Sequence, residues 1–161
     1  MVVVVGDLEN GAALIDRALT LNPNLGWGWH VSALAKAWLG LPEIALEHAA
    51  RAMRLSPQDP QISGMHVSAG FAHFVAGHFD EALAGAQAAV RGQFNFFMGT
   101  CVAAASAAMA GKTAEAEAAM ARLLELNSGL RLSNLRELVP FRRSEDFSRW
   151  SEGLRKAGLP E

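Results

Sequence analysis

Histidines are the side chains of this sequence best suited to metal binding or acid–base chemistry, so their spacing is considered first. A zinc site on helices needs two ligands at i and i+3 or i+4, with a carboxylate nearby. No two of the five histidines have that spacing; His66 and His73 are seven positions apart. We therefore predict no metal site, a packed core position for His73 and an exposed position for His78.

Nucleophilic side chains are also present, but none has a partner at a fixed spacing. Ser63, Ser68 and Ser106 fall in segments with helical patterning and lack a nearby base. Cys101 is the lone cysteine, and it has no charged neighbour in the sequence that would lower its pKa. It lies in an alanine-rich segment, which predicts a small buried side chain. We predict no catalytic residue, no cofactor and no enzyme activity for this chain.

Composition and charge narrow the class of protein further. The chain has 161 residues, 51% of them hydrophobic, and a formal net charge of −2. No apolar run reaches the roughly 20 residues needed to span a bilayer, and Val2 to Val5 lack the features of a signal peptide. Arg142 and Arg143 lie in a mildly basic tail, but acids follow them, which favours a solvated face over a nucleic-acid site. We expect a soluble cytoplasmic protein that binds neither membranes nor nucleic acid.

Helical patterning extends along the whole chain, and glycines divide it at a nearly constant interval. Four of them are 34, 37 and 34 positions apart, each between two segments that could form the arms of a helical hairpin. Intervals of this length are typical of stacked repeat proteins. We expect Gly77 to end one helix and Asp80 to cap the next. The four glycines are Gly6, Gly40, Gly77 and Gly111.

Two other features follow the same interval. Pro23 and Pro57 are 34 positions apart, and each comes just after a predicted second helix, where proline stops a helix. Small residues recur five positions after each hairpin glycine, where they would let two helix axes approach closely. These small residues are Gly11, Ala45, Ala82 and Ala116.

With these positions the sequence resembles the tetratricopeptide repeat family, in which antiparallel helix pairs stack into a right-handed superhelix. The third unit departs from the motif, with His66 for the tryptophan and Phe94 for the terminal proline, and the fourth unit also departs from it at its later positions. The best-matching unit carries the motif residues Trp29, Ala33, Gly40, Ala45, Ala52 and Pro57.

The resemblance divides the chain into repeat units and a cap. The units are residues 1–24, 25–58, 59–94 and 95–128, and residues 129–161 form capping helices. The first unit is incomplete: Val2 to Val5 would be the last turn of its first helix and Asp7 to Leu21 its second, which implies a piece of something longer. The valines could instead be a cloning remnant or a frayed end. Capping helices are expected over Leu130 to Val139 and, capped by Ser144, over Glu145 to Ala157.

The tail has a more particular resemblance, carried by Gly129 to Arg136, Pro140 to Asp146 and Gly153 to Glu161. It looks like the extreme C-terminus of bacterial regulators in which a class III adenylate or guanylate cyclase domain, or a winged-helix domain, precedes tetratricopeptide repeats. The resemblance implies a regulatory module at the end of a larger signalling protein. Residues that perform cyclase chemistry would lie upstream of this sequence.

In this family the first helices of the repeats line a concave groove, which here would be apolar and aromatic. The lysine and asparagine clamp that some members use for a peptide carboxylate is missing. We assign Trp29, Phe79 and Phe147 to the core, whereas Trp27, Trp38 and Phe71 could belong to either core or groove. The predicted groove consists of Trp27, His30, Leu34, Trp38, Val67, Phe71, Phe74, Val75, Met98, Cys101, Ala105 and Met109.

These observations predict an all-α protein-interaction module whose groove binds an apolar segment of a partner, of a second copy or of an upstream part of the same protein. A sensor that binds a small hydrophobic ligand is the alternative. An open furrow would favour a polypeptide, and a closed cavity would favour a small molecule.

Overall fold

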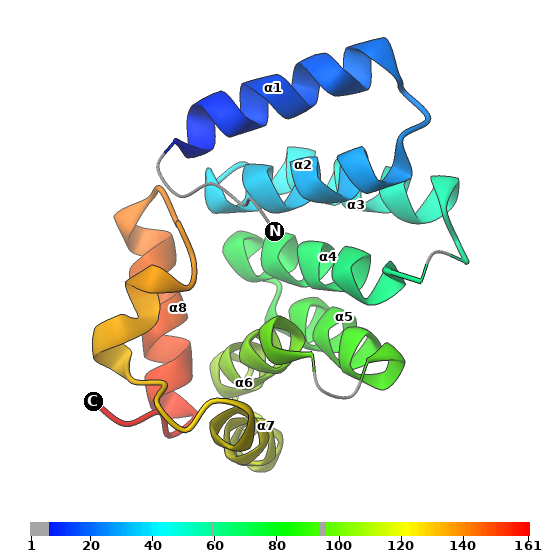
Figure 1. The fold of residues 1–161 in the computed structure, drawn as a ribbon. Helices are drawn as coiled ribbons and strands as arrows, with labels where there is room; N and C mark the ends of the chain where they lie inside the picture. Colours follow the sequence, from blue (N-terminus) through cyan, green and yellow to red (C-terminus); the bar gives the residue numbers. More distant parts are fainter. Residues whose placement is uncertain (1–6, 59, 94–95) are drawn as a thin grey trace.

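The computed structural model describes residues 7–58, 60–93 and 96–161, and within these ranges its regular structure is helical throughout (Figure 1). The all-α hairpin architecture predicted from the sequence is confirmed. The helices follow one another as α1 (Leu8–Leu21), α2 (Gly26–Trp38), α3 (Pro42–Leu55), α4 (Ile62–Ala76), α5 (Phe79–Gly92), α6 (Phe97–Met109), α7 (Thr113–Leu126), the 3-10 helix η1 (Leu132–Glu137) and α8 (Ser144–Lys156).

The hairpin turns follow from the spaced glycines. Gly40, Gly77 and Gly111 have φ values of 77°, 82° and 75°, a left-handed conformation that residues with a Cβ rarely adopt. In each turn the next N–H donates to the carbonyl five residues earlier, as from His78 to His73 at 2.9 Å. This bond satisfies a free carbonyl at the helix end. Gly6, and the proposed helical turn at Val2 to Val5, lie outside the described residues.

The expected caps at Asp80 and Ser144 are wrong. The left-handed turn uses only Gly77 and His78, so α5 already begins at Phe79 and Asp80 lies within its first turn. The Asp80 carboxylate instead pairs with Lys112 at 2.7 Å. Ser144 is likewise the first residue of α8 and makes no capping bond. Asp7, by contrast, accepts a hydrogen bond from the Asn10 N–H at 3.0 Å and starts α1.

Small residues let the two helices of a hairpin pack closely. At the crossing of α4 and α5, a Cβ built on Gly85 would lie 3.2 Å from the His66 carbonyl oxygen and 3.5 Å from the Gly70 Cα. Ala45, Ala82 and Ala116, at the predicted small positions, are buried. Close contact of this kind maximises dispersion attraction between the helices and excludes water.

The C-terminal helix does not extend the stack. α8 runs across it, along one side of α4 and α6 (Figure 1). We expected its apolar face to pack on the fourth repeat unit, and it does contact α6, but it reaches α4 as well. Arg149 was expected to face water; its Nη1 instead donates to the Val75 carbonyl of α4 at 2.9 Å. The last helix therefore joins several hairpins from one side.

Candidate functional site

The middle of the predicted concave groove is covered by α8. Most of its side chains face other parts of the chain, and Trp27 alone among them is more than half exposed, at 51%. Whether any of these residues contacts a partner stays a prediction. Trp38, Val67, Phe71, Phe74, Val75, Cys101 and Ala105 are buried, and His30, Leu34, Met98 and Met109 are half-buried.

Trp150 of α8 packs against the middle of the predicted groove. Its ring centroid lies 5.2 Å from that of Phe71, 5.4 Å from that of Phe74 and 6.0 Å from that of Phe141. Trp38 continues the cluster at 5.9 Å from Phe71. Because aromatic pairs at these separations combine large buried areas with favourable ring electrostatics, the cluster holds α8 firmly on the groove. A partner could reach Phe71 or Phe74 only after α8 moved.

Polar contacts fix the register of the segment that leads into α8. The Arg142 N–H donates to the Trp38 carbonyl at 2.8 Å, and Arg143 donates to the Gly40 carbonyl at 3.3 Å. Asp146 lies between Arg143, at 3.5 Å, and Arg149, at 3.7 Å, and is only 1% exposed. Burial raises the pKa of Asp146 although both arginines oppose the change. These contacts bind α8 to the ends of α2 and α4.

The aromatic residues assigned to the core from the sequence are all only half-buried. Trp29 lies under the Arg51 guanidinium, and Phe147 lies under that of Arg136 at 3.9 Å. Phe79 packs against Phe74 with ring centroids 5.4 Å apart. These rings therefore lie at the edges of the core.

Exposed apolar side chains are concentrated at the N-terminal end of the described chain. Among the residues that the structure describes, seven large apolar side chains are more than a third exposed, and these lie between residues 14 and 55. We call them the N-terminal surface. Sequence reasoning found only Trp27 among them, although the seven-residue spacing of two leucines along one face of α1 was a readable signal. The seven are Leu14, Leu21, Leu25, Trp27, Leu41, Ile44 and Leu55.

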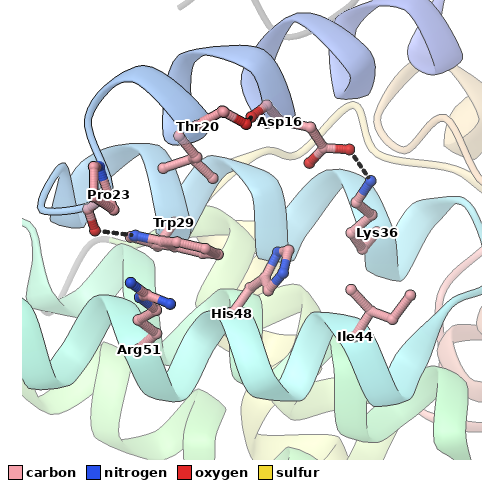
Figure 2. Close-up of a pocket in the computed structure, with 9 residues that line it drawn as sticks. Asp16, Thr20, Pro23, Trp29, Lys36, Ile44, His48 and Arg51 are labelled. Atoms are coloured by element: carbon pink, nitrogen blue, oxygen red, sulfur yellow. Dashed lines mark hydrogen bonds and ion pairs between the residues drawn. The ribbon is translucent and has the colours of Figure 1, made fainter.

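A cleft of about 540 Å³ opens between α1 and α3, with α2 as its floor (Figure 2). Trp29 forms one end of this floor, and its indole N–H donates to the Pro23 carbonyl at 2.9 Å. At the other end of the cleft Lys36 binds Asp16 at 2.6 Å. We call this the Trp29 cleft; it is lined by Asp16, Leu19, Thr20, Pro23, Trp29, Lys36, Ile44, His48 and Arg51.

His48 lies between the two ends of the Trp29 cleft. Its ring meets Trp29 edge-on at 4.7 Å, and its Nδ1 shares a hydrogen bond of 2.9 Å with the Ser32 hydroxyl. Burial lowers the pKa of His48, and the positive charge of Lys36 lowers it further. The ring is therefore neutral at physiological pH and adds no charge to the cleft.

Two serine–histidine pairs were missed from the sequence. Ser32 contacts His48, and Ser68, expected to lack a nearby base, lies 2.5 Å from His30 Nδ1. Both hydroxyls are completely buried, so no substrate could reach them. Asp16 approaches Ser32 rather than the histidine, which is not the arrangement of a catalytic triad. The pairs satisfy buried polar groups between helices.

The expected positions of Cys101 and His78 agree with the structure: Cys101 is completely buried and His78 is exposed. His73, expected in the core, is only half-buried and lies beside His78. Among the residues that the structure describes, no three histidine, cysteine or carboxylate side chains gather as metal ligands, and no helix is long and apolar enough to cross a membrane.

The structure resembles the crystal structure of MamA. The TM-score is 0.66 with 16% sequence identity, over 94% of this chain and 87% of that chain. MamA is a tetratricopeptide-like all-helical protein, and the likeness supports the predicted repeat fold. At this identity it shows the fold alone. No protein-family model matches this sequence, and no curated protein matches it.

Proposed function

We propose that this chain is a protein-interaction module that binds its partner on the N-terminal surface rather than in the concave groove. The observation that carries the proposal is the distribution of exposed apolar groups. Leu14 and Leu21 of α1 are 68% and 80% exposed, whereas Trp150 packs against Phe71 and Phe74 in the groove. Large exposed apolar side chains that are concentrated in one part of a fold, here α1 to α3, mark a candidate interaction site.

The helical-repeat scaffold supports this proposal. Stacked hairpins offer extended, rigid surfaces on which a second polypeptide can lie without reorganising the scaffold. The Trp29 cleft is open to solvent along its length, and this shape favours a polypeptide over the alternative of a small hydrophobic ligand. A second copy of the chain is another candidate occupant of the N-terminal surface.

The resemblance of the tail to bacterial regulators also suggests in which kind of protein the module works. A module of this kind at the end of a bacterial signalling protein would bind a regulator and transmit that event to an upstream catalytic or DNA-binding domain. Identification of the gene's full coding sequence tests this setting, because a cyclase or winged-helix domain must then precede the repeats.

Site-specific photocrosslinking tests the docking surface. A photoreactive amino acid replaces Leu21 in the full-length protein in its own cells, and a matched variant carries it at Glu117, which is exposed on α7. We expect one or a few proteins to crosslink at residue 21 and not at residue 117. Crosslinking to a second copy would identify self-association. Equal crosslinking at both positions, or none at either, would overturn the proposal.

Affinity measurements on the captured protein complete the test. Replacement of Leu14 and Leu21 by serine should weaken its binding at least tenfold while the circular dichroism spectrum is unchanged. Binding that survives this double substitution would exclude the N-terminal surface as the docking site.

A further inference from the structure

The Trp29 cleft is bounded by matching faces of three helices. Ile44, His48 and Arg51 of α3 are at i, i+4 and i+7 and line one wall. Trp29 and Lys36, at i and i+7 of α2, line the floor. The opposite wall comes from α1 and the turn after it. Ile44 and Arg51 are thus about 10 Å apart along α3, two helical turns at 1.5 Å per residue.

Charge in this cleft is unevenly balanced. Lys36 is only 13% exposed and is neutralised by Asp16 at 2.6 Å. Arg51 makes no ion pair or hydrogen bond to any residue in the described part of the chain; its guanidinium carbon lies 4.2 Å over the Trp29 ring. His48, between them, is neutral at physiological pH because burial lowers its pKa. One end of the cleft holds the Lys36–Asp16 ion pair, and the other holds the Arg51 guanidinium, which has no ion-pair partner among the described residues (Figure 2).

Stacking on Trp29 prepares Arg51 for a carboxylate. The indole contacts one face of the planar guanidinium and leaves its N–H donors, which point outward from the edge, available. A side chain held in this way loses little further freedom when it binds, and the paired N–H groups match the two oxygens of a carboxylate. At the other end of the cleft Ile44, beside the Lys36–Asp16 pair, offers a partly exposed aliphatic surface for aliphatic side chains.

We infer that the Trp29 cleft binds one face of an acidic amphipathic helix, with aliphatic side chains beside Ile44 and an aspartate or glutamate, about two turns along the helix, on Arg51. The inference rests on the proposed interaction function and names the chemistry of the partner. The cleft volume of about 540 Å³ holds several side chains of such a helix, whose backbone lies across the opening.

Selection from a displayed peptide library tests this chemistry without knowledge of the natural partner. The library presents helices with aliphatic residues fixed at two positions one turn apart and every amino acid at the positions two turns further on. We expect enrichment of aspartate or glutamate there with the native protein, and of lysine or arginine with the Arg51→Glu variant. The Arg54→Glu variant is the matched control, since Arg54 is exposed on α3 but does not line the cleft, and it should keep the native preference.

Three results would overturn the inference: no enriched peptide, enrichment of neutral peptides, or an acidic preference that Arg51→Glu leaves unchanged. A double-mutant cycle on the best peptide gives a second readout. Arg51→Gln and the peptide's Glu→Gln should each weaken binding about tenfold, and the two together little more than either alone. If crosslinking at residue 21 succeeds while the selection fails, the interaction function stands but the cleft does not bind an acidic helix; if both fail, so does the interaction function.

Discussion

Trp150 and Phe71 pack with ring centroids 5.2 Å apart, and neither side chain has any exposed surface. Phe71 belongs to a first helix of the repeat stack, and Trp150 belongs to the C-terminal helix. The middle of the groove predicted from the sequence is therefore occupied by the chain itself.

Removal of the Trp150 side chain should strongly destabilise the protein. We expect Trp150→Ala to lower the free energy of unfolding by about 3–5 kcal/mol, the range for loss of a large buried aromatic ring. Trp27→Ala is the control; because Trp27 is 51% exposed, it should lower the free energy by less than about 1 kcal/mol. Urea unfolding followed by circular dichroism measures both. Equal effects of the two substitutions would mean that α8 is not docked as described.

Gly153 sets how closely α8 approaches α6. A Cβ built there would lie 3.0 Å from the Ala105 carbonyl oxygen and 3.2 Å from its Cα, and these backbone atoms cannot move independently. We expect Gly153→Ala to destabilise the protein by about 1–3 kcal/mol, even though alanine favours helix by about 1 kcal/mol.

Gly129→Ala provides the comparison for that substitution, because the nearest atom to a Cβ at Gly129 is the Asn127 Oδ1 at 3.5 Å. Thermal unfolding of the two variants should show a lower midpoint for Gly153→Ala alone. A midpoint for Gly153→Ala at or above that of the native protein would contradict the close approach of α8.

The repeat architecture was predictable because local sequence determines it. A helix often ends in a left-handed residue, and glycine adopts that conformation most easily. The spacing of Gly40, Gly77 and Gly111 therefore gives the positions of the turns without knowledge of long-range contacts. The cap at Asp80 failed for an equally local reason. A turn two residues shorter than expected moved the helix start, and either register satisfies the same sequence signals.

The position of α8 was not predictable in the same way. Its apolar spacing shows that one face is buried, but the same stripe would suit the end of the stack or its concave side. The decision depends on contacts distant in sequence, such as that between Arg149 and the Val75 carbonyl. The Trp29 cleft depends likewise on the pairing of Asp16 with Lys36 across two helices. No local pattern encodes either contact.

Cys101 should be unreactive in the folded protein. Its side chain is completely buried in α6, and desolvation raises the pKa of the thiol far above its usual range, so almost no thiolate forms. We expect no labelling by a thiol-specific disulfide reagent at neutral pH over the time in which urea-unfolded protein labels completely. Rapid labelling without urea would show that α6 opens readily or is not buried as described.

Asp146 should make stability depend on pH in a direction unusual for an aspartate. Burial raises its pKa in the folded protein above the ordinary 3.8, so the folded state binds this proton more tightly than the unfolded chain. Its contribution to stability is therefore complete below the ordinary pKa and is lost as the pH rises through the raised folded value. Relative to Asp146→Asn, which does not titrate, the native protein should become less stable from about pH 4 to neutral pH.

Urea unfolding of both proteins at about pH 4, 5.5 and 7 measures this difference. The quantity compared is the change with pH in the difference in free energy of unfolding between the two proteins. A pH-independent effect of the asparagine amide does not contribute to this change, and groups that titrate alike in both proteins do not contribute either. Should the native protein instead gain stability relative to Asp146→Asn as the pH rises, Arg143 and Arg149 would outweigh burial. The buried carboxylate would then act as an ion-pair anchor that holds α8 on the groove at neutral pH.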